Sequence, residues 1–186
     1  MTAYEKRYHG LDRAAWGYFF LYFNINIGNV SLLPTFVGYL LFLSAIGLME
    51  AGERELSLLR PLAMLLATWH GLDWFLSFFG KDLYGLQFID LIRDAVNLYF
   101  HFQLLTNLAS IAARHQPEEC EFDWKLLKYR TLQTLMITAI WILTYFDHWF
   151  GDYWGLISGG MGVVYVIAGV CLMRAIFGLR RSLPEE

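Results

Sequence analysis

The chain has 186 residues, of which 57% are hydrophobic, 18% are aromatic and only 17% are charged, and its formal net charge is −3. About a quarter of the residues of an ordinary soluble domain are charged, so this composition argues against a water-soluble globule. The sequence has no basic stripe typical of nucleic-acid binding, and we expect no nucleic-acid partner. With only two cysteines, Cys120 and Cys171, the chain cannot build a disulfide framework.

Six apolar segments follow one another along the chain. A membrane-spanning helix needs about 20 apolar residues, so six spans use about 120 residues and leave no room for a separate soluble domain. We therefore predict an all-α fold, a polytopic integral membrane bundle of about six transmembrane helices in which residues 1–186 form a single domain. The segments cover residues 14–30, 34–49, 56–79, 83–113, 131–150 and 154–178.

The first segment is irregular toward its end. Asn24, Asn26 and Asn29 alternate with apolar residues, and Pro34 disfavours helix at Leu33. This pattern predicts that the first transmembrane helix is broken from Asn24 to Pro34, where the backbone is extended. Extended backbone at bilayer depth is tolerated only under protein or beside a wet cavity, so we expect Asn24, Asn26 and Asn29 to point into the bundle.

The basic residues predict the orientation of the six spans. Of the 14 Lys and Arg residues, all except Lys81 and Arg93 fall on the side that holds both termini. The positive-inside rule makes that side cytoplasmic. We therefore expect a multi-pass protein of the cell membrane, embedded in the lipid bilayer, with both termini in the cytoplasm. The basic residues on that side are Lys6, Arg7, Arg13, Arg54, Arg60, Arg114, Lys125, Lys128, Arg130, Arg174, Arg180 and Arg181.

Polar residues within the spans lie between the membrane centre and the outer face. An ionisable side chain in a span costs about 2.5 to 3.5 kcal/mol on insertion scales, and it indicates function unless shown otherwise. In residues 83–113 the polar positions recur every three or four residues, which puts them on one helix face. We therefore predict one outward-facing polar pocket that binds a polar or cationic ligand, as in a transporter-like protein, a sensor or an accessory subunit. Its candidate residues are Asn24, Asn26, His70, Asp73, Asp90, Arg93, Asp94, Asn97, His101, Asp147 and His148.

One arginine lies between two acids on this face. Arg93 cannot neutralise both Asp90 and Asp94, so we expect a further cation, a proton or a ligand to take up the remaining charge. The alternative is that the three residues form an internal salt bridge that only holds helices together.

A divalent metal is a second interpretation of the same residues. His70, Asp73, Asp94 and His148 are ligand types that zinc and similar ions accept, and they come from different helices, as in bundle metal sites. This makes an intramembrane metal-dependent hydrolase, acting on a lipid or a membrane-embedded substrate, an alternative function. No HExxH or comparable motif assigns catalytic residues. A third alternative is a structural or assembly partner that binds no ligand.

Two segments suggest protein contacts. Gly155, Gly159 and Gly162 belong to pairs of small residues at four-residue spacing, which let helices approach closely. We expect this packing within the bundle, with a homo-oligomer as the alternative. The loop that begins at Arg114 and ends at Lys128 reads as a solvated loop with its lysines at lipid headgroups, and the alternative is a docking site for a cytoplasmic partner.

Overall fold

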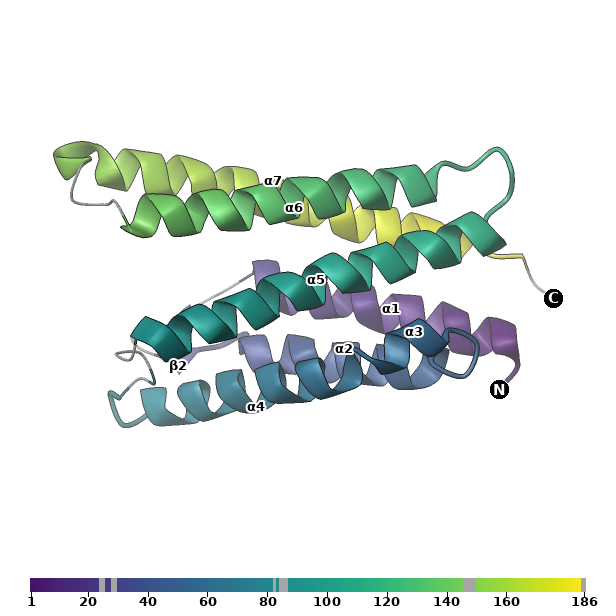
Figure 1. Cartoon of the computed structure of the whole chain (residues 1–186), viewed down its shortest axis with the longest axis horizontal. Coiled ribbons are helices and arrows are strands. Elements are labelled where there is room, and N and C mark those ends of the chain that lie inside the picture. The colour runs from purple at the N-terminus through teal and green to yellow at the C-terminus, as the bar shows by residue number, and fades with distance from the viewer. Residues whose placement is uncertain (24–25, 28–29, 82, 84–86, 146–149, 185–186) are drawn as a thin grey trace.

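The structure, a computed structural model, describes residues 1–184 except 24–25, 28–29, 82, 84–86 and 146–149. Its described part is helical, apart from one pair of two-residue strands, which confirms the predicted all-α class. The long helices run alternately up and down the bundle (Figure 1). They are α1 (Ala3–Tyr22), α2 (Thr35–Met49), α4 (Arg60–Ser77), α5 (Gln87–His115), α6 (Phe122–Tyr145) and α7 (Trp154–Ser182). Two short elements, α3 (Arg54–Ser57) and the 3-10 helix η2 (Gly151–Tyr153), lie in the connections.

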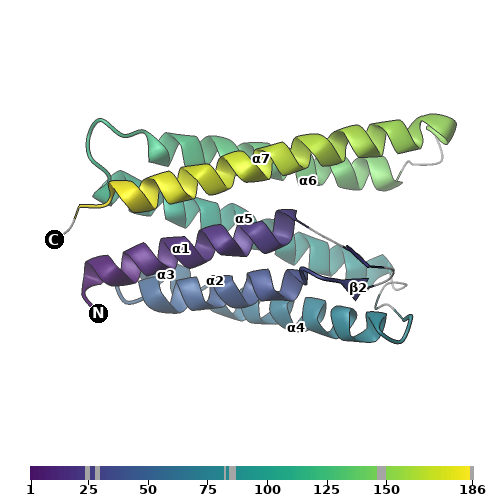
Figure 2. The same cartoon turned by 180° about the vertical axis from the view of Figure 1, so that it is seen from behind.

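The long helices form a lower group and an upper pair. Helices α1, α2 and α4 lie together, α6 and α7 form an antiparallel pair, and α5 runs between the two groups in both views (Figures 1 and 2). Both chain termini lie at the same end of the bundle, which we call the termini end. The opposite end holds the β-hairpin formed by the two short strands, and we call it the hairpin end after that β-hairpin.

The predicted break lies where the sequence placed it, but it separates two helices. Helix α1 starts at Ala3, well before the apolar segment, and ends at Tyr22. Thr2 stabilises this early start with a capping box, since its side chain accepts from the Glu5 N–H and Glu5 accepts from the Thr2 N–H. Strands β1 (Asn26–Ile27) and β2 (Val30–Ser31) then pair antiparallel before α2. The extended segment is thus a connection at the hairpin end and not half of a span.

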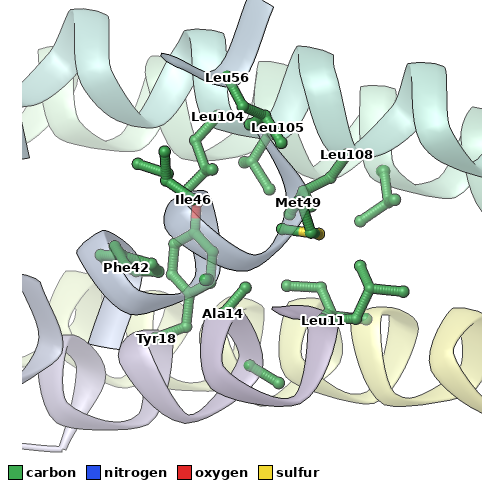
Figure 3. Packing of buried hydrophobic residues seen from close by; sticks show 14 of the residues in the cluster. Leu11, Ala14, Tyr18, Phe42, Ile46, Met49, Leu56, Leu104, Leu105 and Leu108 are labelled. Atoms are coloured by element: carbon green, nitrogen blue, oxygen red, sulfur yellow. The ribbon is translucent and has the colours of Figure 1, made fainter. Parts of the chain in front are cut away.

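The apolar core lies toward the termini end. Leu11 and Tyr18 of α1, Phe42 and Ile46 of α2 and Leu104 of α5 are fully buried. Figure 3 shows their side chains meeting between the three helices. The buried residues of α7 likewise lie in its last half, from Gly169 to Leu179. The α6–α7 hairpin is therefore anchored at the termini end.

Glycines allow close packing of α1 against α2. A Cβ on Gly17 would lie 2.7 Å from the Phe42 ring, and one on Gly38 would lie 2.8 Å from the carbonyl oxygen of Gly17. The expected packing at Gly155, Gly159 and Gly162 is absent from the described bundle, because a Cβ there meets nothing within 4 Å. That expectation was wrong because these glycines lie in the half of α7 that has few neighbours.

One described helix, α7, is long and apolar enough to cross a membrane on its own. The most apolar 18-residue stretch of α7 has a mean hydropathy of 2.1, and only 11% of that stretch is buried. A core helix of a soluble protein passes the same hydropathy test but is mostly buried, which α7 is not. Helix α2 is also apolar but has only 15 residues.

Candidate functional site: a buried polar network around Tyr39

Polar side chains from α1, α2 and α5 form one continuous chain of contacts through Tyr39 and His101. Tyr39 of α2 donates to Asn97 Oδ1 of α5 at 2.6 Å. The same hydroxyl lies 3.3 Å from His101 Nε2, and His101 Nδ1 lies 3.4 Å from the Tyr18 hydroxyl of α1. Tyr18, Tyr39 and His101 are all almost completely buried. Buried polar groups need partners, and this network supplies them.

The direction of each hydrogen bond follows from the number of protons. Tyr39 has a single hydroxyl proton, which goes to Asn97. At the contact with His101 the Tyr39 oxygen must therefore accept, so His101 Nε2 carries the ring proton. His101 Nδ1 then accepts from the Tyr18 hydroxyl. The chain thus runs in one direction, from Tyr18 through His101 and Tyr39 to Asn97, and it ties α1 and α2 to α5.

His70 brings α4 to the same network. Its ring stacks on the Tyr39 ring with the centroids 5.2 Å apart and the planes 4° from parallel. The structure thus brings His70, Asn97 and His101 together around Tyr39, and the binding of a ligand by them stays a prediction.

The charged residues of α5 lie within two helical turns of Asn97 toward the hairpin end. The Arg93 guanidinium bridges both acids, since Nη1 lies 3.2 Å from Asp90 Oδ1 and Nη2 lies 2.6 Å from Asp94 Oδ1. Its Nε also donates to Asp94 Oδ1, at 2.8 Å. The side chains of Asp90 and Asp94 are 23% and 27% exposed, against 12% for Arg93. The acids therefore face outward around a more deeply buried arginine, and the expected fourth charged group stays a prediction.

The part of Asp73 in a ligand site stays a prediction, and its side chain bonds to the connection that follows α4. Its Oδ1 accepts the Leu83 N–H at 3.1 Å, which ties the connection after α4 to α4 itself. One residue further, Trp74 Nε1 donates to the Ser31 carbonyl at 2.9 Å and holds β2 against α4. Both bonds fix connections at the hairpin end.

Some predicted site residues cannot be located. Asn24, Asp147 and His148 lie outside the described residues, and Asn26 is described only as part of β1. Within the described part of the chain, no three His, Cys, Asp or Glu side chains form a group that could hold a metal ion. His70, Asp73 and Asp94 therefore do not form a ligand set by themselves.

Tyr18 and Tyr39 were not predicted as site residues. Each directly follows a glycine that packs between α1 and α2, namely Gly17 and Gly38. The sequence does contain a Gly-Tyr pair in each of two successive apolar helices. This pattern indicates a shared site only once the structure shows that the two helices face each other.

A second polar group, between α5 and α6, was also missed. Arg130 Nη1 donates to Thr106 Oγ1 at 3.0 Å, and the Arg130 guanidinium lies 4.4 Å from the centre of the Phe102 ring. Gln103 Nε2 donates to Asn107 Oδ1 at 3.3 Å on the same stretch of α5. The two Arg130 contacts tie α6 to α5.

The connection between α5 and α6 is held by one side chain. Gln116 Oε1 accepts the Phe122 N–H at 2.9 Å, and its amide donates to Asp123 Oδ1 at 2.8 Å. The second bond holds the pKa of the Asp123 carboxyl below its usual range, because it stabilises the ionised form. This loop is thus locally ordered at the start of α6, and the docking of a cytoplasmic partner on it stays a prediction.

No family model, curated protein or solved structure matches this chain.

Proposed function

We propose that the chain is a polytopic protein of the cell membrane with six spans and both termini in the cytoplasm. The exposed surface supports this, because every long helix directs large apolar side chains outward. Soluble monomers rarely expose extended apolar surface, whereas a bilayer requires it. Examples, one from each helix, are Trp16, Leu40, Leu72, Leu91, Leu135 and Val163.

The distribution of charge supports the same topology. The helices alternate in direction, so the basic residues other than Lys81 and Arg93 gather in the half of the bundle next to the termini. A single span through α7 would leave the apolar outer faces of α4 and α5 in water. Six spans cover those faces with lipid.

Epitope tags at both termini test whether the number of spans is even or odd. In six spans both tags lie in the cytoplasm and are protected from protease in intact cells, and both are digested in inside-out vesicles. In a single span through α7 the two tags lie on opposite sides. Protection of only one tag would therefore contradict the proposed topology.

We further propose that the acidic face of α5 binds a cationic or strongly polar ligand from the outer side. The observation that supports this site is that one oxygen of the Asp94 carboxylate is accessible. Arg93 occupies its Oδ1, whereas its Oδ2 has no hydrogen-bond partner among the described residues, and the side chain is 27% exposed. An accessible carboxylate oxygen, held in place beside the buried network, is suited to a cation.

A cysteine next to Asp94 tests the site without knowledge of the ligand. In a protein with Cys120→Ser and Cys171→Ser, Asp90→Cys should react from outside intact cells with impermeant methanethiosulfonates. The trimethylammonium reagent should react at least about fivefold faster than the sulfonate reagent, since about 1 kcal/mol of attraction to Asp94 corresponds to that factor. Adding Asp94→Asn should remove the preference.

Tyr153→Cys is the matched control, because Tyr153 is 72% exposed in the connection before α7. Its preference should not depend on Asp94. Failure of Asp90→Cys to react from outside, or equal rates with the two reagents, would contradict an outward-facing cation site.

A second candidate function is assembly, with a second copy of the chain bound along α7. Gly155, Gly159 and Gly162 leave open space at their Cβ positions, and Leu156 and Val163 beside them are 78% and 61% exposed. The groove between α6 and α7 also contains an apolar cavity of about 490 Å³. Small residues beside an apolar groove suit close helix packing in a membrane.

Cysteine crosslinking tests this homo-oligomer. Ser158→Cys, in the background that lacks native cysteines, should form a disulfide-linked dimer in isolated membranes. Gly159→Leu should prevent the crosslink because it fills the contact. Gly47→Leu is the matched control, since a Cβ on Gly47 of α2 also meets nothing within 4 Å. A crosslink that survives Gly159→Leu, or no crosslink at all, would contradict the dimer.

A further inference from the structure

Two buried amide side chains lack hydrogen-bond partners on α5 and α6, which lie side by side next to the connection that joins them (Figure 1). Asn107 of α5 is 4% exposed and Gln133 of α6 is 5% exposed. The Asn107 oxygen accepts from Gln103, but the Asn107 nitrogen has no partner among the described residues. Neither the nitrogen nor the oxygen of the Gln133 amide has one. Because buried polar groups are almost always hydrogen-bonded, this part of the bundle is incomplete.

Arg130 of α6 adds an uncompensated positive charge to the same region. Its Nη1 donates to Thr106 Oγ1 at 3.0 Å, and its guanidinium lies 4.4 Å from the centre of the Phe102 ring. No carboxylate of the described residues pairs with Arg130, and its buried Nε has no acceptor there. Arg93 and Arg180, by contrast, each pair with a carboxylate. The Arg130 charge is therefore balanced only by a hydroxyl and an aromatic ring.

The three incompletely bonded side chains lie near one another on the two helices. Arg130 and Gln133 are three residues apart on α6, which makes them neighbours on one helix face. The bond from Arg130 to Thr106 fixes which turns of α5 and α6 are adjacent, and Asn107 directly follows Thr106. Together they present three N–H donor groups that lack acceptors, as well as one positive charge.

We propose that Arg130, Asn107 and Gln133 bind the oxyanion of a singly charged anionic lipid. Guanidinium groups bind phosphate and carboxylate oxygens in pairs, and one guanidinium balances one negative charge. A phosphodiester headgroup, as in phosphatidylglycerol, supplies that charge on two free oxygens. Arg130 is half-buried and can be reached from the surface, whereas the two amides lie deeper. We therefore expect the amides to turn toward the bound oxygens.

The position of Arg130 favours a lipid as the source of the oxyanion. Arg130 directly precedes the apolar segment 131–150, so the proposed topology places it at the level of the inner headgroups. The Phe102 ring under its guanidinium is 38% exposed and would face the acyl chains. Basic pockets between helices on the cytoplasmic side of a membrane bind anionic headgroups. The lipid source rests on the proposed topology, whereas the oxyanion chemistry rests only on these side chains.

The experiment uses the purified full-length chain in detergent and measures lipid binding by native mass spectrometry. Dioctanoyl phosphatidylglycerol is compared with dioctanoyl phosphatidylcholine, whose phosphate is offset by a trimethylammonium group. We expect phosphatidylglycerol to bind about tenfold more tightly, since one charge-assisted hydrogen bond contributes at least that factor. Arg130→Gln should remove this preference. It leaves no carboxylate of the described residues without its partner, so this variant should fold.

Gln133→Leu separates lipid binding from a structural role. The Gln133 amide has no hydrogen bond to lose within the described part of the chain, so the Tm in lipid-free detergent should stay the same or rise. Phosphatidylglycerol should bind about threefold more weakly, because one hydrogen bond to the oxyanion is lost. A lower Tm with unchanged affinity for phosphatidylglycerol would overturn the proposed site.

Lys128→Gln is the matched control for Arg130→Gln. Lys128 carries the same charge two residues away on α6, and its ammonium lies 5.3 Å from the centre of the Trp124 ring. This variant should bind phosphatidylglycerol like the wild-type protein. Equal affinity for the two lipids, or equal effects of Arg130→Gln and Lys128→Gln, would overturn the proposal. Competition by dimethyl phosphate at the same concentration as phosphatidylglycerol would support the oxyanion site and overturn a lipid as its source.

The outcomes for this site and for the topology can be told apart, because binding in detergent needs no membrane orientation. If the preference for phosphatidylglycerol depends on Arg130 but the epitope tags contradict six spans, only the topology fails. If the tags support six spans but the two lipids bind equally, only the lipid site fails.

Discussion

The α1–α2 pair and the hairpin-end half of α7 both contain several glycines. Glycines allow close helix packing in the α1–α2 pair but not in this half of α7. Gly17 and Gly38 lie against Phe42 and against backbone of the facing helix. Gly155 and Gly159 face open space. The same residue type thus marks a completed contact in one region and an unoccupied surface in the other.

This difference shows which surfaces of the bundle are already packed within the chain and which are still exposed. Around α1 and α2 the apolar core and the Tyr39 network satisfy the side chains from within the chain. Around α7 the exposed apolar residues need lipid or another helix. Substitutions in the first region should therefore disturb folding, and substitutions in the second should disturb association.

The largest effect is expected from Arg93→Ala on α5, the helix that packs beside the α1–α2 pair. This change strands Asp90 and Asp94 without the guanidinium that bridges them. Removing one partner of a buried ion pair costs about 3 to 5 kcal/mol. We expect little folded protein in the membrane fraction, measured by quantitative immunoblotting. Asp94→Asn should keep normal abundance, and normal abundance of Arg93→Ala would show that the bridge is not needed for folding.

The glycines give the next effect, and they compare the two regions directly. Gly38→Leu forces side-chain atoms against the Gly17 carbonyl, and overpacking of this kind costs about 3 kcal/mol. Gly159→Leu meets open space, so its free energy of unfolding should change by less than about 0.5 kcal/mol. Thermal unfolding of both variants in detergent measures the contrast. Equal destabilisation would contradict the difference between the two regions.

A smaller effect is expected from Tyr39→Phe. Loss of the hydroxyl leaves Asn97 Oδ1 without its donor and His101 Nε2 without its acceptor, which costs about 2 kcal/mol. Tyr18→Phe should cost less, because its contact with His101 is longer, at 3.4 Å. Tyr153→Phe, at an exposed position, is the control. Thermal unfolding that ranks Tyr18→Phe as the more damaging change would contradict the central place of Tyr39.

Several features of the fold could be predicted from local patterns. The apolar segments gave the helices, and the alternating Asn residues with Pro34 gave the extended stretch before α2. The first apolar segment begins at residue 14, whereas α1 begins at Ala3, because a hydropathy pattern does not detect the polar first turns of a helix. The capping box at Thr2 and Glu5 was the better signal for the helix start.

The candidate site could be predicted only in part. Spacing on one helix placed Asn97 and His101 on a common face, which the structure bears out. It could not find Tyr18 and Tyr39, since a buried tyrosine in an apolar helix looks like any other core residue until its partner is known. It likewise could not show that Asp73 accepts a backbone N–H from the following connection.

The number of membrane crossings is tested most directly by thiol labelling of single cysteines at three connections. The native Cys120 reports on the α5–α6 connection in a Cys171→Ser protein. Lys81→Cys and Tyr153→Cys report on the two connections at the hairpin end, in a background that also lacks Cys120. Six spans predict that an impermeant maleimide added to intact cells labels the cysteines at 81 and 153 but labels Cys120 only after permeabilisation. Labelling of all three positions from the same side, as a single span through α7 requires, would contradict the account.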